Sequence, residues 1–158
     1  MYVRVTSEFD CTPERAWTEL LRTRLLAYVV WPLVVFEPLD PDPLPTLWSE
    51  GGYLVRIRPF GLFPLGTHTI RIEIPTVETT PGSQRYEFRD DGSGELLSTW
   101  DHRITIEETD DGRTRYTDAV EVGAGLLTPA FWVLAHLLYR YRQHRWGRLV
   151  RNGYDYSR

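Results

Sequence analysis

The stretch TWDHRITIEETDDGRTRYTDAVEV, residues 99–122, decides the fold. On both sides of Asp110-Asp-Gly112, apolar or aromatic residues alternate with charged and polar ones, which is the period of a half-buried β-strand. A three-residue loop pairs Thr109 with Arg113 and predicts an antiparallel hairpin. One face of this hairpin is charged and the other is largely apolar. We therefore expect an antiparallel sheet with one solvated face and one covered face.

The same alternation extends the predicted sheet in both directions along the chain. Residues 2–9 form a first strand before any other element. Turn signals at Pro81-Gly82, Asp91-Gly92 and Asp111-Gly112 separate successive strands of a meander. The meander strands are expected at residues 53–58, 67–74, 85–89, 96–107 and 113–122.

Two helix starts flank this sheet. Thr12-Pro13 places a hydroxyl N-cap before a proline at the first helical position, and an apolar stripe then predicts one helix or two short ones as far as about residue 30. Residues 37–46 contain four prolines and are expected to be an extended connection. Thr128-Pro129 repeats the start signal before a long helix over 129–151. Its apolar positions are Phe131, Leu134, Leu138, Tyr141 and Leu149.

Composition excludes several classes of function. The chain has 158 residues, a net charge of -4, one cysteine, and 18 basic residues that are all arginine. Without lysine there is no Schiff-base chemistry and no Walker-type phosphate lysine. A single cysteine allows no internal disulfide and no cysteine zinc cluster, and the acidic balance argues against a nucleic-acid partner. We expect one domain over residues 1–158.

Membrane spans are not expected, because the longest apolar stretches, residues 25–36 and 126–139, are shorter than a bilayer requires. The N-terminus has no charged start followed by an apolar run, so we expect no secretory signal and a cytoplasmic location.

This order of elements resembles the START/Bet v1-like superfamily, also known as SRPBCC or polyketide cyclase/dehydrase and lipid transport. The resemblance is carried by Thr12–Trp17, Trp100–Ile104, Gly112–Asp118, Gly123–Pro129 and Arg142–Trp146. It implies an α+β helix-grip fold, in which a curved antiparallel sheet of six or seven strands wraps around a long C-terminal helix. A seventh strand would then lie near residues 33–36 or 47–51. Members of the superfamily bind lipids, sterols, hormones or polyketides, and a minority catalyse cyclisation or dehydration.

The covered face of the sheet carries polar side chains that could serve chemistry. The hairpin register makes His102 and Asp118 diagonal neighbours, and a carboxylate beside a histidine would raise its basicity and fix its tautomer. The pair is a candidate general acid and base, or alternatively a buried polar pair that orients the sheet on the helix. The candidate ligand-binding residues are Tyr53, His68, Tyr86, Trp100, His102, Tyr116, Asp118, Leu134 and Leu138.

Neither a metal nor another cofactor is expected. His68 and His102 belong to strands that a third strand separates, and Gly123-Ala-Gly125 lacks the third glycine of a dinucleotide fingerprint. The apolar loop at residues 59–66 could be a lid, a dimer contact, a weak membrane contact or a cover for the adjacent core. The arginine run at residues 140–151 is read mainly as a solvated helix face, with an anion site as the alternative.

Three hypotheses of function follow. The chain binds a small apolar ligand between sheet and helix, as a monomer or a homodimer. Alternatively, it is a cyclase or dehydratase in which Asp118 orients His102. The third hypothesis is an interaction domain whose cavity is filled by its own aromatic side chains, of which there are six Trp, nine Tyr and six Phe.

Overall fold

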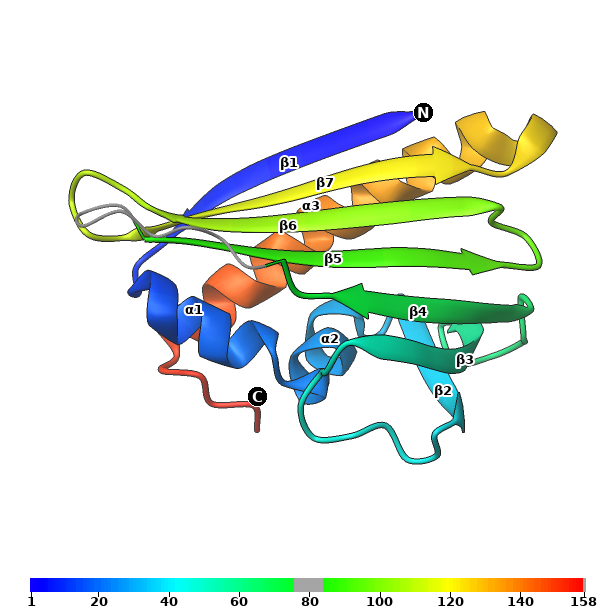
Figure 1. Cartoon of the computed structure of the whole chain (residues 1–158), viewed down its shortest axis with the longest axis horizontal. Coiled ribbons are helices and arrows are strands. Elements are labelled where there is room, and N and C mark those ends of the chain that lie inside the picture. Colours follow the sequence, from blue (N-terminus) through cyan, green and yellow to red (C-terminus); the bar gives the residue numbers. More distant parts are fainter. Residues whose placement is uncertain (76–83, 158) are drawn as a thin grey trace.

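A seven-stranded antiparallel sheet in the order β1-β7-β6-β5-β4-β3-β2 lies over a long helix in the computed structural model (Figure 1). The structure describes residues 1–75 and 84–157, so the predicted turn at Pro81-Gly82 lies outside the described residues. The strands are β1 (Tyr2–Phe9), β2 (Val34–Asp40), β3 (Gly51–Pro59), β4 (Thr67–Glu73), β5 (Arg85–Gly94), β6 (Thr99–Glu108) and β7 (Thr114–Gly123). The helices are α1 (Pro13–Leu20), α2 (Thr23–Val30), the short 3-10 helix η1 (Gly125–Leu127) and α3 (Thr128–Arg151).

The β6–β7 hairpin has the register that the sequence predicts. The Thr109 backbone N–H donates to the Arg113 carbonyl at 2.9 Å, which closes the loop. His102 consequently lies opposite Val120, and Ile104 lies opposite Asp118. This register is the first condition for bringing the predicted polar pair together.

The seventh strand is β2, and it confirms the prediction of a strand near residues 33–36. It also runs on to Asp40, so the first residues of the proline-rich segment are paired with β3 rather than part of a connection. Pro38 is compatible with β2 because this is an edge strand, where a missing backbone N–H breaks no inner ladder. The prediction of a connection that starts at residue 37 was therefore wrong by four residues.

Strand β5 continues through the predicted turn at Asp91-Gly92, which was also wrong, and ends at Gly94. Its glycines have a packing reason. A Cβ atom on Gly92 would lie 2.6 Å from His68 Nε2 and 2.8 Å from the Thr69 carbonyl oxygen, and one on Gly94 would collide with the backbone of Thr67. These glycines let β5 pass close to β4 with the His68 ring against it.

The helix starts differ from each other. Thr12 caps α1 as predicted, since its Oγ1 accepts a hydrogen bond from Arg15 N at 3.3 Å. The predicted cap at Thr128 was wrong: Thr128 is the first residue of α3, and its hydroxyl accepts from Ala124 N and donates to the Gly125 carbonyl. The Thr128 side chain thus joins η1 to α3 instead of capping the helix.

The buried face of α3 shares only Leu149 with the apolar stripe that the sequence predicts. Leu134 is 57% exposed, and the helix buries another row of side chains against the sheet and α2. This row consists of Ala135, Tyr139, Arg142, Gln143, Trp146, Leu149 and Val150. The physical reason is that the first half of α3 borders a cavity and packs in the core through Ala135 and Tyr139, whereas the second half is buried more extensively.

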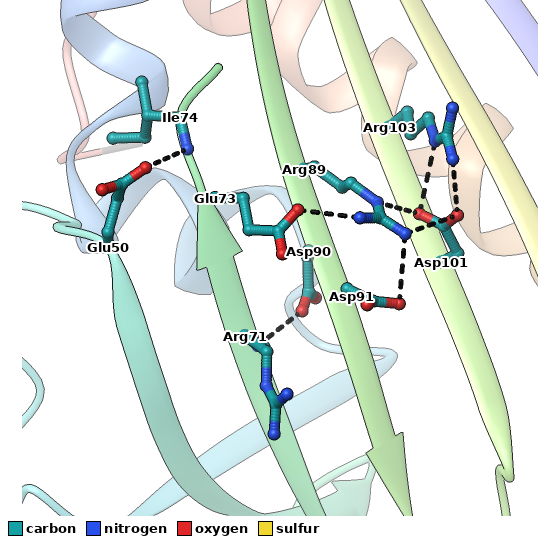
Figure 2. Close-up of polar contacts among 9 residues, drawn as sticks. All are labelled: Glu50, Arg71, Glu73, Ile74, Arg89, Asp90, Asp91, Asp101 and Arg103. Atoms are coloured by element: carbon teal, nitrogen blue, oxygen red, sulfur yellow. Dashed lines mark hydrogen bonds and ion pairs between the residues drawn. The ribbon is translucent and has the colours of Figure 1, made fainter.

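The outer face of the sheet is charged, as predicted. Arg89 on β5 lies between Glu73 and Asp101, with Nη1–Oε2 and Nε–Oδ1 distances of 2.8 Å each (Figure 2). Arg103 joins the same group through Asp101. Opposite charges on neighbouring strands pair with each other on this face, and the covered face holds the candidate site.

Candidate ligand cavity and its polar end

A cavity of about 450 Å³ lies between the inner face of the sheet, α2 and the first half of α3. Its volume is within the range of small-molecule sites. Most of its wall is aliphatic or aromatic. The lining residues are Leu26, Val30, Leu33, Val34, Phe36, Ile57, Pro59, Phe60, Leu65, Gly66, Thr67, His68, Ile70, Asp90, Gly94, Leu96, Leu97, Trp100, His102, Phe131, Leu134, Ala135, Leu137, Leu138, Tyr139 and Arg142.

The mouth of the cavity is apolar. Five of the lining residues are also exposed to solvent, so they mark where the cavity opens: Phe60, Leu65, Leu96, Leu134 and Leu137. The loop at residues 59–66 contributes two of them, and Leu62 at its tip is 72% exposed. The loop therefore does more than cover the adjacent core, because it forms part of the cavity rim.

A second hollow of about 40 Å³ adjoins the polar end of the cavity. Asp90, His102 and Arg142 line both spaces, together with Leu26 and Ile70. The polar side chains of the cavity are thus concentrated on the wall that separates it from this hollow.

His102 and Asp118 are brought together as the sequence predicts. His102 Nε2 lies 2.8 Å from Asp118 Oδ1, and both side chains are buried. The Tyr116 hydroxyl donates to the same oxygen at 2.7 Å, and Gln143 Nε2 donates to Asp118 Oδ2 at 2.9 Å. Three elements, β6, β7 and α3, therefore meet at one carboxylate.

The pKa values of this pair follow from competing effects. Burial alone would raise the pKa of Asp118, but the Arg142 charge and the donated hydrogen bonds hold it below its ordinary value. Burial lowers the pKa of His102, and the opposing effect of Asp118 does not restore it. Asp118 is thus ionised and His102 neutral at pH 7, so Nε2 carries the proton and Nδ1 is the unprotonated nitrogen. The predicted rise in the basicity of His102 was wrong, because burial outweighs the effect of Asp118.

Asp90 is a site residue that the sequence reasoning missed. Its Oδ1 accepts a hydrogen bond from the Arg71 backbone N–H at 2.8 Å (Figure 2). Its side chain keeps some accessible surface because it lines the cavity, yet it is removed from bulk water, and burial raises its pKa to about 7. The signal was present: Asp90 shares the strand face of Tyr86 and Phe88, and the misread turn at residues 91–92 concealed it.

Arg142 is the second missed residue. It belongs to the run predicted to be a solvated helix face, but only 6% of it is exposed. Its Nη1 lies 3.9 Å from Asp118 Oδ1, and its guanidinium carbon lies 5.8 Å from the centre of the Tyr139 ring. The expectation that the arginines remain on the solvated side was therefore wrong for Arg142.

The structure brings part of the predicted ligand-binding set to the cavity. His68, Trp100, His102, Leu134 and Leu138 line it. The other four members of the set, Tyr53, Tyr86, Tyr116 and Asp118, are not among its lining residues.

Those four residues have other contacts. The Tyr53 hydroxyl donates to the Ser49 carbonyl at 3.0 Å, and the Tyr86 ring stacks on Trp17 with ring centres 5.2 Å apart. Tyr116 and Asp118 lie behind His102, in the hydrogen-bonded cluster already described. Asp118 can therefore act on a ligand only through His102 or Arg142.

The described part of the chain offers neither a metal-binding cluster nor a membrane-spanning helix. Residues 1–75 and 84–157 contain no group of three or more His, Cys, Asp or Glu side chains placed to hold a metal ion. Within the same ranges, no helix has the length and apolar character needed to cross a bilayer.

Comparison with known proteins identifies the fold. No family model matches the chain, and a search of curated proteins found no match. A solved structure from Chromobacterium violaceum superposes with a TM-score of 0.64 at 18% identity, covering 94% of this chain and 96% of the other. A START superfamily protein from Mycobacterium smegmatis gives 0.62 at 13% identity, covering 96% and 97%. An aromatase/cyclase from Streptomyces gives 0.53 at 16% identity, covering 95% and 90%.

The protein therefore has the helix-grip fold of the START/Bet v1-like superfamily, as the sequence resemblance implied. Its structural neighbours include a START superfamily protein and an aromatase/cyclase.

Proposed function

We propose that this protein binds one small, mostly apolar molecule in the cavity between the sheet and α3. The observation that carries the proposal is the cavity itself, about 450 Å³ with an apolar wall and a few polar groups at one end. Such a space is the usual form of a site for a drug-sized ligand. It also argues against the hypothesis that aromatic side chains fill the interior, because that hypothesis requires little free volume.

The apolar rim supports the same proposal. Phe60, Leu134 and Leu137 are more than half exposed and would be costly to leave in water without a role. At the mouth of an apolar cavity they provide a continuous apolar path for the ligand. We propose that the site is complete within a single cytoplasmic domain over residues 1–158, whether the protein is a monomer or a homodimer.

The test has two arms. Solvent extraction of the purified protein followed by mass spectrometry is expected to release an apolar compound. Thermal unfolding in a panel of apolar compounds should show stabilisation of about 2.7 kcal/mol at a hundred times Kd, which is a rise in Tm of about 5–10 °C for a chain of this size. An empty extract together with an unchanged Tm across the panel would refute the proposal.

A matched pair of variants places the binding in this cavity. Leu138 lines the cavity, so Leu138→Trp should fill part of it and abolish the thermal shift. Val133 lies on the same helix but is exposed and does not line the cavity, so Val133→Trp should leave the shift unchanged. Equal effects of the two substitutions would place binding elsewhere.

A second candidate is catalysis of a cyclisation or dehydration, which the His102–Asp118 pair on the cavity wall favours. Neutral His102 would accept or donate the proton at the ligand, and Asp118 would orient its ring. In assays with polyketide-type substrates, His102→Ala should lower turnover by about 10²–10⁴-fold while ligand binding persists. Unchanged turnover of every substrate by His102→Ala would exclude this role.

A further inference from the structure

The polar end of the cavity contains an arginine whose hydrogen-bonding capacity is unused. Arg142 has five N–H donors, yet none takes part in a hydrogen bond with the residues that the structure describes. Its Nε is buried without a partner, and its Nη1 is 3.9 Å from Asp118, beyond hydrogen-bond length. Asp118 already accepts from His102, Tyr116 and Gln143. Because unpaired buried donors are costly, the guanidinium is suited to an acceptor atom of a ligand.

Asp90 and His68 supply further hydrogen-bonding groups in the same cavity. Asp90 Oδ1 is occupied by Arg71 N, which leaves Oδ2 for a ligand. His68 is buried, its Nδ1 has no partner, and burial lowers its pKa to about 4, so it is neutral at pH 7. Together with Arg142 they give the cavity one polar end.

The charges at this end decide between classes of ligand. Arg142 and Asp118 cancel, and His68 and His102 are neutral. Asp90 has a pKa of about 7 and contributes either no charge or one negative charge. A ligand anion would therefore bury an uncompensated negative charge beside Asp118. A ligand cation would face the guanidinium and leave all its donors unpaired.

We infer that Arg142 and Asp90 bind an uncharged oxygen acceptor of the ligand, so that the cavity selects apolar molecules bearing a ketone, ester or similar carbonyl group. Arg142 donates to the carbonyl oxygen, and Asp90 provides a second donor when it is protonated. The remaining wall, which includes Phe36, Trp100 and Phe131, surrounds the apolar body. This inference rests on the proposed function and adds the chemical class of the ligand.

The test compares four naphthalenes of similar size that differ in one group: ethylnaphthalene, acetylnaphthalene, naphthoate and naphthylmethylamine. Their affinities are measured at pH 7 by competition with the dye Nile red. A hydrogen bond from a charged donor predicts that acetylnaphthalene binds about ten- to a hundredfold more tightly than ethylnaphthalene. The anion and the amine should both bind more weakly than the ketone.

Two arginine variants provide the control. Arg142→Met should remove the preference for the ketone while affinity for ethylnaphthalene is retained, which also shows that the cavity is intact. Arg140 is exposed on the same helix, so Arg140→Met should keep the full preference. If Arg142→Met does not fold, the wild-type ligand series still decides the question.

Each contrary result has a distinct meaning. Tightest binding of naphthoate would overturn the inference in favour of an oxyanion site, and tightest binding of the amine would overturn it in favour of an ionised Asp90 site. Equal affinity for acetylnaphthalene and ethylnaphthalene would leave binding proven but remove the carbonyl specificity. Failure of all four ligands, together with an empty solvent extract, would overturn the proposed function itself.

Discussion

Substitution of Asp118 by asparagine should destabilise the protein far more than a comparable change elsewhere on the same strand. The buried carboxylate accepts hydrogen bonds from His102, Tyr116 and Gln143 and is the nearest negative charge to Arg142. Asparagine keeps the shape of the side chain but places an NH₂ group against one of these hydrogen-bond donors. It also removes the negative charge that compensates the Arg142 guanidinium. Breaking one side of a buried charge pair costs about 3–5 kcal/mol.

Urea unfolding measures this effect directly. With an m-value of about 2 kcal/mol/M, the expected loss lowers the midpoint by about 1.5–2.5 M. Glu121 is exposed on the same strand β7, and Glu121→Gln should change the free energy of unfolding by less than about 0.5 kcal/mol.

The pH dependence provides an internal check on the same variant. Since the folded-state pKa of Asp118 is depressed, its ionised form stabilises the protein above its unfolded pKa near 4, and this stabilisation is lost as pH falls through the folded pKa. The difference between wild type and Asp118→Asn should therefore be complete at pH 7 and shrink in acid. A loss below about 1 kcal/mol at pH 7, or one independent of pH, would refute the assignment of Asp118 as an ionised acceptor.

Two further predictions concern β5. Asp90 has a folded-state pKa raised to about 7, so the folded chain binds more protons than the unfolded chain between about pH 4 and 7. As pH rises through this window, the free energy of unfolding of the wild type relative to Asp90→Asn should fall by at most about 1.4 kcal/mol per pH unit. Urea unfolding of both proteins at several pH values checks this, and a difference in unfolding free energy that does not change with pH would show that Asp90 titrates normally. The titratable and charged groups around Asp90 are Arg71 N and His68 on β4, Asp91 on β5, Asp101 and His102 on β6, and Tyr139 and Arg142 on α3. Gly94→Ala should lower the free energy of unfolding by about 1–3 kcal/mol, because the new Cβ collides with backbone that cannot rotate away. Gly52→Ala on β3 should leave the free energy of unfolding nearly unchanged, since its Cβ meets only Thr69 Cγ2 at 3.6 Å. Equal Tm values for the two alanine variants would contradict the close approach of β4 and β5.

The part of the site that could be predicted from sequence is the part that local rules determine. The loop at Asp110-Asp-Gly112 and the two-residue period together define the β6–β7 register, and the register alone places His102 within reach of Asp118. No long-range information is needed for this step, because both residues belong to one hairpin.

Arg142 could not be found in that way. A helix with apolar residues on several sides has more than one plausible buried face, and choosing between them requires knowing where the sheet leaves space. Here the sheet leaves a cavity beneath the first half of α3, so Leu134 borders the cavity mouth and Arg142 takes an inner position. Charge normally argues for exposure, and this residue is buried at the polar end of the cavity.

Asp90 shows a different limit. Aspartate followed by glycine is a strong turn signal, so the sequence predicts a turn at Asp91-Gly92. The two-residue spacing of Asp90 and Phe88, which places both side chains on one face of a strand, is the weaker signal. The competing fact is tertiary, since Gly92 and Gly94 are needed for the approach of His68 on β4 rather than for a turn.

The unequal burial of the two halves of α3 has a consequence for backbone motion. Val133, Leu134 and Leu137 contribute little buried area, whereas Trp146 and Leu149 are fully enclosed. Amide protons in the first turns should therefore exchange with solvent through local openings, and those around Trp146 only through global unfolding. A ligand could then enter and leave the cavity when the N-terminal end of α3 unfolds briefly, while the rest of the protein stays folded.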